Sequence, residues 1–247
     1  MSSTDKFILH WLDQSRSHRI LWLFETLGLN YELKIYKRTK EFRAPKELEK
    51  VHPLGKSPVI EIIREGKEPL LLAETGHIIQ YVVENYDTTN ILKTSTPEEK
   101  ELVDYYLHFT EASLQGFLVA LLVGQIAQTK APWGTGFLVK LVTSGINSQY
   151  FQPELLKSLK FLESQLAKKS TNQYFVGNKL TGADVILSFP IIDNLFSNPA
   201  RASTLSGGEV NLVRDFPNLH AWTENVLKLP SYVKTNEIID KKLGSKL

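Results

Sequence analysis

The sequence contains no cysteine among its 247 residues. This absence excludes disulfide bonds, cysteine metal sites and every mechanism in which a protein thiol is the nucleophile. If the protein carries out thiol chemistry, the sulfur therefore has to come from a substrate.

Motifs for metals, nucleotides and serine hydrolysis are missing as well. The six histidines show no ligand spacing such as HExxH, so we expect no metal site. The sequence has no GxSxG, GxGxxG or P-loop motif. Hydrolase, dinucleotide-binding and NTPase functions are therefore unsupported.

Neither sign of charge dominates, and no apolar run is long. The sequence has 29 basic and 27 acidic residues, a net charge of +2, which argues against a nucleic-acid-binding surface. The longest apolar run, "FLVALLV" at 117–123, is too short to span a bilayer. The first residues lack the apolar core of a secretory signal. We therefore expect no transmembrane segment, and any membrane contact to be peripheral.

The first third of the chain alternates strand and helix patterns. Residues 6–12 and 31–36 have the composition of strands, and residues 16–28 between them have apolar side chains at helical spacing, ended by Gly28. This order predicts a βαβ unit with parallel strands. Residues 58–63 and 69–73 flank a short turn and predict an antiparallel hairpin. A second helix follows, with Thr75 as its expected N-cap.

Beyond residue 86 the strand patterns end. Residues 87–96 break the periodicity and are expected to form a linker. Thr96 then starts a long helix that extends to about residue 128, because Pro97 and Glu99 follow at the favoured positions. Helical patterns continue to the end. We therefore predict an α/β domain at 1–86 and an all-helical domain at 97–247.

Two serines precede the first helix, and each has two interpretations. Ser15 or Ser17 can simply cap the helix, which is the more common use of such a residue. Alternatively, a hydroxyl at this helix end can donate a hydrogen bond to a bound thiolate, which the helix dipole also favours. Arg19 is expected to be structural, on the helix face opposite the core.

Two further junctions are candidate ligand sites. Ser57 precedes Pro58, where a cis peptide would expose backbone groups to an extended peptide-like ligand, although most such bonds are trans. Glu74 and Thr75 stand at a helix start, where N–H groups can bind a carboxylate and Glu74 can accept from an ammonium. An ordinary N-cap explains the second pair equally well.

The order of these features resembles the glutathione transferases over nearly the whole chain. The matching stretches are "DQSRSHRILWL", "HPLGKSPVIE", "LLLAETG", "LTGADV" and "FPNLHAWTENVLKLPSY". The finer match is similar to the fungal (yeast) microsomal-type branch, in "HWLDQSRSHRILWLFE", "YKRTKEFRAPKELEKVHPLGKSP" and the long region 116–150. The resemblance implies a thioredoxin-like βαβ-ββα domain followed by an all-helical domain.

The resemblance also implies roles for single residues. Counting four positions back from Arg19 makes Ser15 the catalytic serine and leaves Ser17 structural. Glutathione would be bound by Ser57, before a cis Pro58, and by Lys56, Glu74 and Thr75. The usual Glu-Ser pair is Glu-Thr here, which keeps the hydroxyl. Thr181 and Asp184 would form a capping box that serves folding.

The implied activity is conjugation of glutathione to a hydrophobic electrophile, with glutathione as co-substrate and no permanently bound cofactor. A glutathione-dependent peroxidase activity would use the same groups. The alternative is a catalytically silent binding or regulatory module of the same fold. A homodimer is expected, and no nucleic-acid partner.

Two observations bear on where the protein acts. The sequence ends in Ser245, Lys246 and Leu247, which is a peroxisomal targeting motif. We therefore predict a peroxisomal location. The alternatives are the cytoplasm or, from the resemblance, peripheral attachment to the endoplasmic reticulum membrane.

Overall fold

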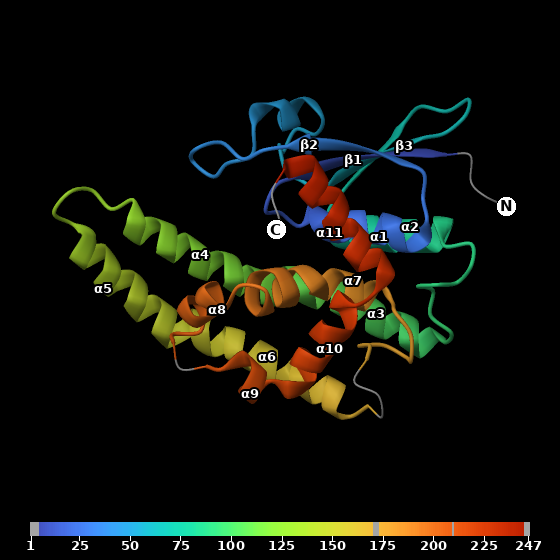
Figure 1. The fold of residues 1–247 in the computed structure, drawn as a ribbon. Coiled ribbons are helices and arrows are strands. Elements are labelled where there is room, and N and C mark those ends of the chain that lie inside the picture. The colour runs from blue at the N-terminus through green and yellow to red at the C-terminus, as the bar shows by residue number, and fades with distance from the viewer. Residues whose placement is uncertain (1–4, 170–172, 209, 245–247) are drawn as a thin grey trace.

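A four-stranded sheet forms one side of the molecule, and helices form the rest (Figure 1). The computed structural model describes residues 5–169, 173–208 and 210–244. In Figure 1 the strands lie at the top, two helices lie directly beneath them, and the helical half of the chain lies below. The predicted targeting residues Ser245, Lys246 and Leu247 lie outside the described residues.

The sheet has the predicted mixed topology. Its strands, in spatial order β2-β1-β3-β4, are Tyr31–Tyr36, Lys6–Leu12, Val59–Ile63 and Leu70–Ala73. The first two are parallel, as the βαβ pattern predicts, and β3 pairs antiparallel with both β1 and β4. This confirms the thioredoxin-like βαβ-ββα arrangement.

Helices α1 (Ser17–Leu27) and α2 (Thr75–Tyr86) cover one face of the sheet. Helix α1 ends where Gly28 adopts a left-handed conformation (φ 62°), which glycine tolerates without strain. The predicted N-cap at the start of α2 is one residue off. Thr75 is already helical, and Glu74 holds the cap position, because the chain turns into α2 directly after β4.

The second half of the chain is helical, as predicted. It begins where the Thr96 hydroxyl accepts a hydrogen bond from the Glu99 N–H at 3.2 Å. Residues 97–129 form one continuous helical run with a π-helical segment, Thr110–Leu114, in the middle. The elements are α3 Pro97–Phe109, α4 Gln115–Thr129, α5 Gly136–Ile146, α6 Gln152–Ala167, α7 Gly182–Ser188, α8 Pro199–Leu205, α9 Leu212–Asp215, α10 Pro217–Leu227 and α11 Pro230–Leu243.

One hydrophobic core joins the two halves. Its buried side chains come from the sheet, from α1 and α2, and from α3, α6, α7 and α10. Helix α1 contacts α2, α7 and α11 besides β1. At the contact between α1 and α11, the Trp22 indole N–H donates to the Ser231 hydroxyl at 3.0 Å. Because it is covered on several sides, α1 is a fixed support for the loop that precedes it.

Thr181 and Asp184 form the capping box at the start of α7. The Asp184 carboxylate accepts from the Thr181 N–H (2.9 Å) and hydroxyl (3.1 Å), and also from the Phe175 N–H and the Trp222 indole N–H, both at 3.0 Å. Burial raises the pKa of Asp184 to about 6, while the hydrogen bonds oppose that rise. Besides capping the helix, Asp184 therefore ties two separate segments, at Phe175 and Trp222, to the N-terminus of α7.

By length and composition alone, one helical run among the described residues could cross a membrane. It is residues 97–129, whose most apolar window has a mean hydropathy of 1.4 and is 28% buried. The sequence prediction of no spanning segment considered only uninterrupted apolar runs, and this helix is interrupted by polar residues. Core helices of proteins that never enter a membrane pass the same test, and Tyr106, Leu107 and Leu114 of this run lie in the core.

Candidate active site

The candidate ligand-binding residues meet at one end of the sheet. In the strand register, His10 of β1 lies opposite Val59 of β3, which lies opposite Ala73 of β4. Thus β1 and β4 end where β3 begins. The loop with Ser15, the Ser57-Pro58 junction, and Glu74 with Thr75 all follow or precede these strand ends directly. Residues far apart in the sequence therefore share one edge, as the resemblance implies.

Ser15 and Ser17 are both buried and are hydrogen-bonded to each other. Their hydroxyl oxygens lie 2.7 Å apart, and the Ser17 N–H donates to the Ser15 hydroxyl at 3.2 Å. The Ser17 hydroxyl also accepts from the Leu12 N–H and donates to the Leu12 carbonyl, each at 3.1 Å. Ser17 thus joins α1 to the end of β1, while Ser15 lies one residue before the N-cap position of α1.

The loop between β1 and α1 is also fixed from the other side. The Arg38 guanidinium donates to the carbonyls of Asp13, Gln14 and Phe42 at 2.9–3.0 Å. Burial lowers the pKa of Arg38, although Asp13 opposes this effect. Arg38 therefore connects the loop that carries Ser15 to the 37–43 segment. Sequence reasoning missed this contact, because nothing in the local pattern marks a long-range guanidinium clamp.

Arg19 contradicts the prediction that it lies opposite the core. Its side chain is completely buried, donates to the Ile186 carbonyl and pairs with Glu111, and its guanidinium lies 5.5 Å from the centre of the Phe189 ring. Burial lowers the pKa of Arg19 to about 10, and Glu111 opposes that shift. The face of α1 that lacks sheet contacts is covered by the second half of the chain, which supplies these partners.

Glu111 pairs with a second arginine beside Ser15. Its other carboxylate oxygen lies 2.9 Å from the Arg16 Nε. Glu111 belongs to the π-helical segment between α3 and α4. One carboxylate from the helical half therefore holds the two arginines that flank Ser17, and this anchors the start of α1 across the boundary between the two halves.

The Ser57-Pro58 peptide bond is cis, which is the arrangement implied by the resemblance and the less frequent one for such bonds. The Ser57 hydroxyl donates to the His10 carbonyl at 2.7 Å. Pro58 is buried and Lys56 is exposed. In the turn before this bond, the His52 ring accepts a hydrogen bond from the Leu54 N–H at 3.3 Å.

Glu74 has an unusual backbone conformation. Its φ of 69° lies in the left-handed region, which is strained for a residue with a side chain. The side chain is exposed, whereas Thr75 next to it is buried. Strain of this kind is typical of ligand-binding positions, where the backbone has to present a side chain in one direction.

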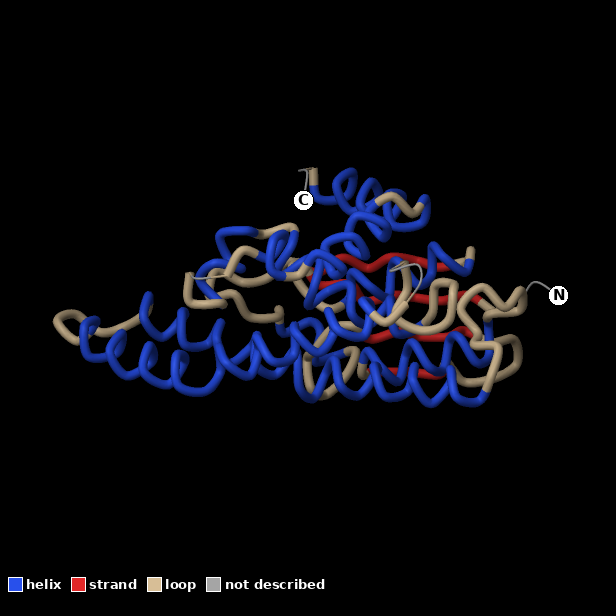
Figure 2. The backbone as a smooth tube through the Cα atoms, turned by 90° about the horizontal axis from the view of Figure 1, so that it is seen from below, coloured by secondary structure: helices blue, strands red, loops and turns tan. Residues whose placement is uncertain are grey.

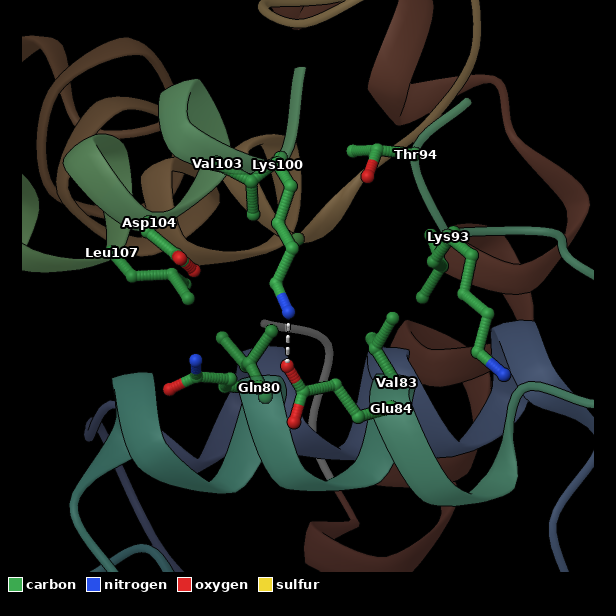
Figure 3. Close-up of a pocket in the computed structure, with 12 residues that line it drawn as sticks. Gln80, Val83, Glu84, Lys93, Thr94, Lys100, Val103, Asp104 and Leu107 are labelled. Atoms are coloured by element: carbon green, nitrogen blue, oxygen red, sulfur yellow. Dashed lines mark ion pairs between the residues drawn. The ribbon is translucent and has the colours of Figure 1, made fainter. Parts of the chain in front are cut away.

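A separate pocket lies between α2 and α3, with a volume of about 420 Å³. Figure 3 shows Lys100 reaching across it to Glu84, with a separation of 3.0 Å in this ion pair. None of the predicted glutathione-binding residues lines it. Among the residues that the structure describes, no group of three His, Asp or Glu side chains is placed to hold a metal ion.

Comparisons with known proteins agree with this geometry. A family model described as "Glutathione S-transferase, N-terminal domain" matches residues 7–84, and one described as "Glutathione S-transferase, C-terminal domain" matches residues 147–230. Glutathione S-transferase 1 of Saccharomyces cerevisiae is 33% identical over 234 residues, which are 93% of each protein.

Solved structures extend the comparison. A glutathione S-transferase from Actinobacillus pleuropneumoniae is 33% identical, with a TM-score of 0.69 over 95% of this chain and 93% of that one. A glutathione transferase homologue from Lodderomyces elongisporus, solved with two GSH per subunit, shares the fold at 24% identity, with a TM-score of 0.71 over 94% and 98%. The arrangement at the sheet end, the two family matches and the relative from yeast together assign this chain to the glutathione S-transferase family.

Proposed function

We propose that this protein conjugates glutathione to electrophilic substrates, with Ser15 as the residue that stabilises the glutathione thiolate. The observation that carries the proposal is the position of the Ser15 hydroxyl beside the N-terminus of α1, hydrogen-bonded to Ser17. A hydrogen-bond donor at a helix N-terminus favours an anion over its neutral form. Glutathione bound to the Lodderomyces relative supports the choice of co-substrate.

The hydrogen bonds around the two serines support different roles for Ser15, which would donate to the thiolate, and Ser17, which would donate to Ser15. The Ser17 hydroxyl has one proton and two acceptors within reach, the Leu12 carbonyl at 3.1 Å and Ser15 at 2.7 Å. When Ser15 donates to the thiolate, Ser17 can donate to Ser15 in turn. The thiol proton leaves to solvent, the thiolate sulfur forms a bond to the electrophilic carbon with its own electron pair, and the bond between that carbon and the leaving group breaks, with its electron pair going to the leaving group.

The remaining contacts to glutathione follow from the resemblance. Ser57 would pair through its backbone with the cysteinyl unit. Glu74 and Thr75 would hold the γ-glutamyl end, and Lys56 would lie near the other carboxylate. The electrophile would bind between the domain at 1–86 and the helical domain at 97–247, which the linker 87–96 connects.

Replacing Glu74 with glutamine is expected to raise the Kd for glutathione about tenfold to a hundredfold. The change removes a charged partner of the ligand ammonium, and a charge-assisted hydrogen bond contributes about 1.5–3 kcal/mol. Isothermal titration measures the effect. Glu65→Gln, in the exposed turn between β3 and β4, is the matched control. Equal Kd values for the two variants would contradict the assigned role.

Conjugation to an activated aryl halide, measured beside retention on immobilised glutathione, tests the function itself. An active enzyme turns over and binds. A catalytically silent module, the second candidate, binds glutathione without turnover. Reduction of an organic hydroperoxide by glutathione in the same preparation tests the proposed peroxidase activity, which needs the same thiolate.

Two further properties belong to this proposal. The chain is proposed to act as a homodimer, as the family resemblance implies. It is proposed to belong to the fungal microsomal-type branch, from the resemblance of "HWLDQSRSHRILWLFE", "YKRTKEFRAPKELEKVHPLGKSP" and the region 116–150. No relative named above carries that designation.

We propose a peroxisomal location from Ser245, Lys246 and Leu247, with the cytoplasm or the endoplasmic reticulum surface as alternatives. A chain with a fluorescent tag at its N-terminus is expected to enter peroxisomes, and deletion of these three residues is expected to leave it outside. An unchanged distribution after the deletion would contradict the proposal.

A further inference from the structure

The helical hairpin formed by α4, α5 and the turn between them, residues 115–146, projects away from the rest of the molecule. Figures 1 and 2 show it from two directions, with its turn as the most distant point. None of the residues of α5 is buried. The hairpin is therefore a surface whose purpose the glutathione site does not explain.

The outer faces of this hairpin are apolar. Phe137 is 70% exposed, Leu141 69%, and Trp133 at the turn is completely exposed. Helix α4 adds further exposed apolar side chains, of which Val119 and Leu122 border a small hollow against α8, whereas Val123 is the most exposed at 57%. The other large exposed apolar residues of the hairpin are Ile126, Leu138, Val142 and Ile146.

The contacts between the two helices are, in contrast, partly polar. The Gln128 amide donates to the Thr143 hydroxyl at 2.7 Å. Gly124 of α4 lies directly against the side chain of Asn147, the residue that follows α5, and a Cβ added to Gly124 would lie 3.2 Å from that side chain. A helix in water normally turns its apolar side chains inward and its polar side chains toward solvent. This hairpin has the opposite arrangement, with small and polar residues between the helices and apolar side chains outward. This is the pattern of helices that pack in lipid.

The charged residues of the hairpin indicate whether a lipid bilayer or another protein covers this surface. From residue 112 to residue 153 the only charged side chains are Lys130 and Lys140, and there is no carboxylate. Lysines beside an exposed tryptophan match the interfacial region of a bilayer, where the ammonium groups reach lipid phosphates and the indole lies at headgroup level. A contact with another protein would more typically have an apolar centre surrounded by a polar rim.

We propose that the 115–146 hairpin attaches this protein peripherally to a lipid bilayer, with Trp133 and the outer faces of α4 and α5 entering the headgroup region. The proposal does not depend on the activity at Ser15. The hairpin could therefore fail to bind lipid in the experiments below while the proposed role of Ser15 in conjugation remained correct.

Tryptophan fluorescence gives a selective test, because Trp133 is the only exposed one of the four tryptophans; Trp11, Trp22 and Trp222 are buried. The full chain is mixed with vesicles of phosphatidylcholine alone and of a phosphatidylcholine–phosphatidylserine mixture. We expect cosedimentation, a blue shift of the emission, and quenching by brominated phosphatidylcholine. Removing both lysines, Lys130→Gln with Lys140→Gln, is expected to lower the preference for the anionic vesicles by about fivefold per lysine.

The double change Leu141→Ser with Val142→Ser is expected to lower vesicle partitioning about tenfold or more, since it removes two large apolar contacts with lipid. Val213→Ser with Val233→Ser, exposed valines outside the hairpin, is the matched control and should bind like the wild type. Thermal unfolding checks that each variant is folded. Wild-type protein that binds neither vesicle, or hairpin variants that bind as well as the control, would overturn the proposal. A third outcome would also overturn it: the wild type is a dimer that does not bind vesicles, and the hairpin variants are monomers. That result would assign the surface to a second copy of the chain.

Discussion

Replacing Ser15 with alanine is expected to lower kcat/KM for glutathione conjugation about 10²–10³-fold, the usual effect of deleting one preorganised hydrogen-bond donor to a reacting anion. The Ser15 hydroxyl is the donor that the account assigns to the thiolate. Because alanine leaves the backbone and the helix end in place, affinity for glutathione should change much less than turnover. Steady-state kinetics with an activated aryl halide, together with calorimetric binding, separate the two effects.

Ser17→Ala is the informative comparison for this prediction. This change removes the hydroxyl that bonds the Leu12 N–H and carbonyl and joins α1 to β1, so its main effect should be a stability loss of about 1–3 kcal/mol. Ser203→Ala, at an exposed position on α8, controls for an ordinary surface change. If Ser17→Ala abolished turnover in folded protein while Ser15→Ala retained it, the assignment of the catalytic serine would be wrong by two residues.

Replacing Glu111 with glutamine is expected to destabilise the protein by about 3–5 kcal/mol. The reason is that Arg19 is fully buried and would keep its charge without its carboxylate partner, and breaking one half of a buried pair has about this cost. Denaturant unfolding of wild type and variant measures the difference. Glu101→Gln, exposed on α3, should change stability by less than about 0.5 kcal/mol.

A double variant sharpens this prediction. Changing Arg19 to methionine together with Glu111 to leucine replaces the buried pair by apolar side chains of similar size. Such replacements often restore much of the stability lost in the single variant. A loss for Glu111→Gln that is no larger than that of Glu101→Gln would contradict the view that Glu111 anchors the start of α1.

The fold was largely predictable because its signals are local. The apolar spacing in 16–28, the alternation in 31–36 and the turn between 63 and 69 each depend on neighbouring residues, and they produced the correct elements and the parallel pairing of β1 with β2. The boundary at α2 was missed by one residue, because the left-handed conformation of Glu74 depends on how β4 meets the helix rather than on residue preference.

The errors and omissions in the site have a common physical cause. Arg19 looked like a surface residue, because a charged side chain on a helix is usually solvated. Its partners, Ile186 and Glu111, lie 167 and 92 residues further along the chain. Arg38 was missed for the same reason, since its three acceptors are backbone carbonyls, which leave no mark in a sequence. Long-range polar contacts of this kind can be identified only once the three-dimensional structure is known.

The hairpin was beyond sequence reasoning in a different way. Its apolar residues were visible, but helices of a core and helices with an exposed apolar face have similar compositions. Only the structure shows that Gln128 and Thr143 face each other while Phe137 and Leu141 face outward. The same comparison explains why a search for uninterrupted apolar runs did not single out residues 97–129.

The pKa of the glutathione thiol in the complex tests the central claim most directly. Ultraviolet absorbance of the thiolate, followed against pH at saturating glutathione, measures it in the wild type and in Ser15→Ala. The account predicts that the wild type lowers this pKa from about 8.5, the value of a free thiol, toward neutrality, and that Ser15→Ala returns it most of the way. A bound thiol that keeps a pKa of about 8.5 in the wild type, or one whose lowered pKa is the same in Ser15→Ala, would contradict the role assigned to Ser15.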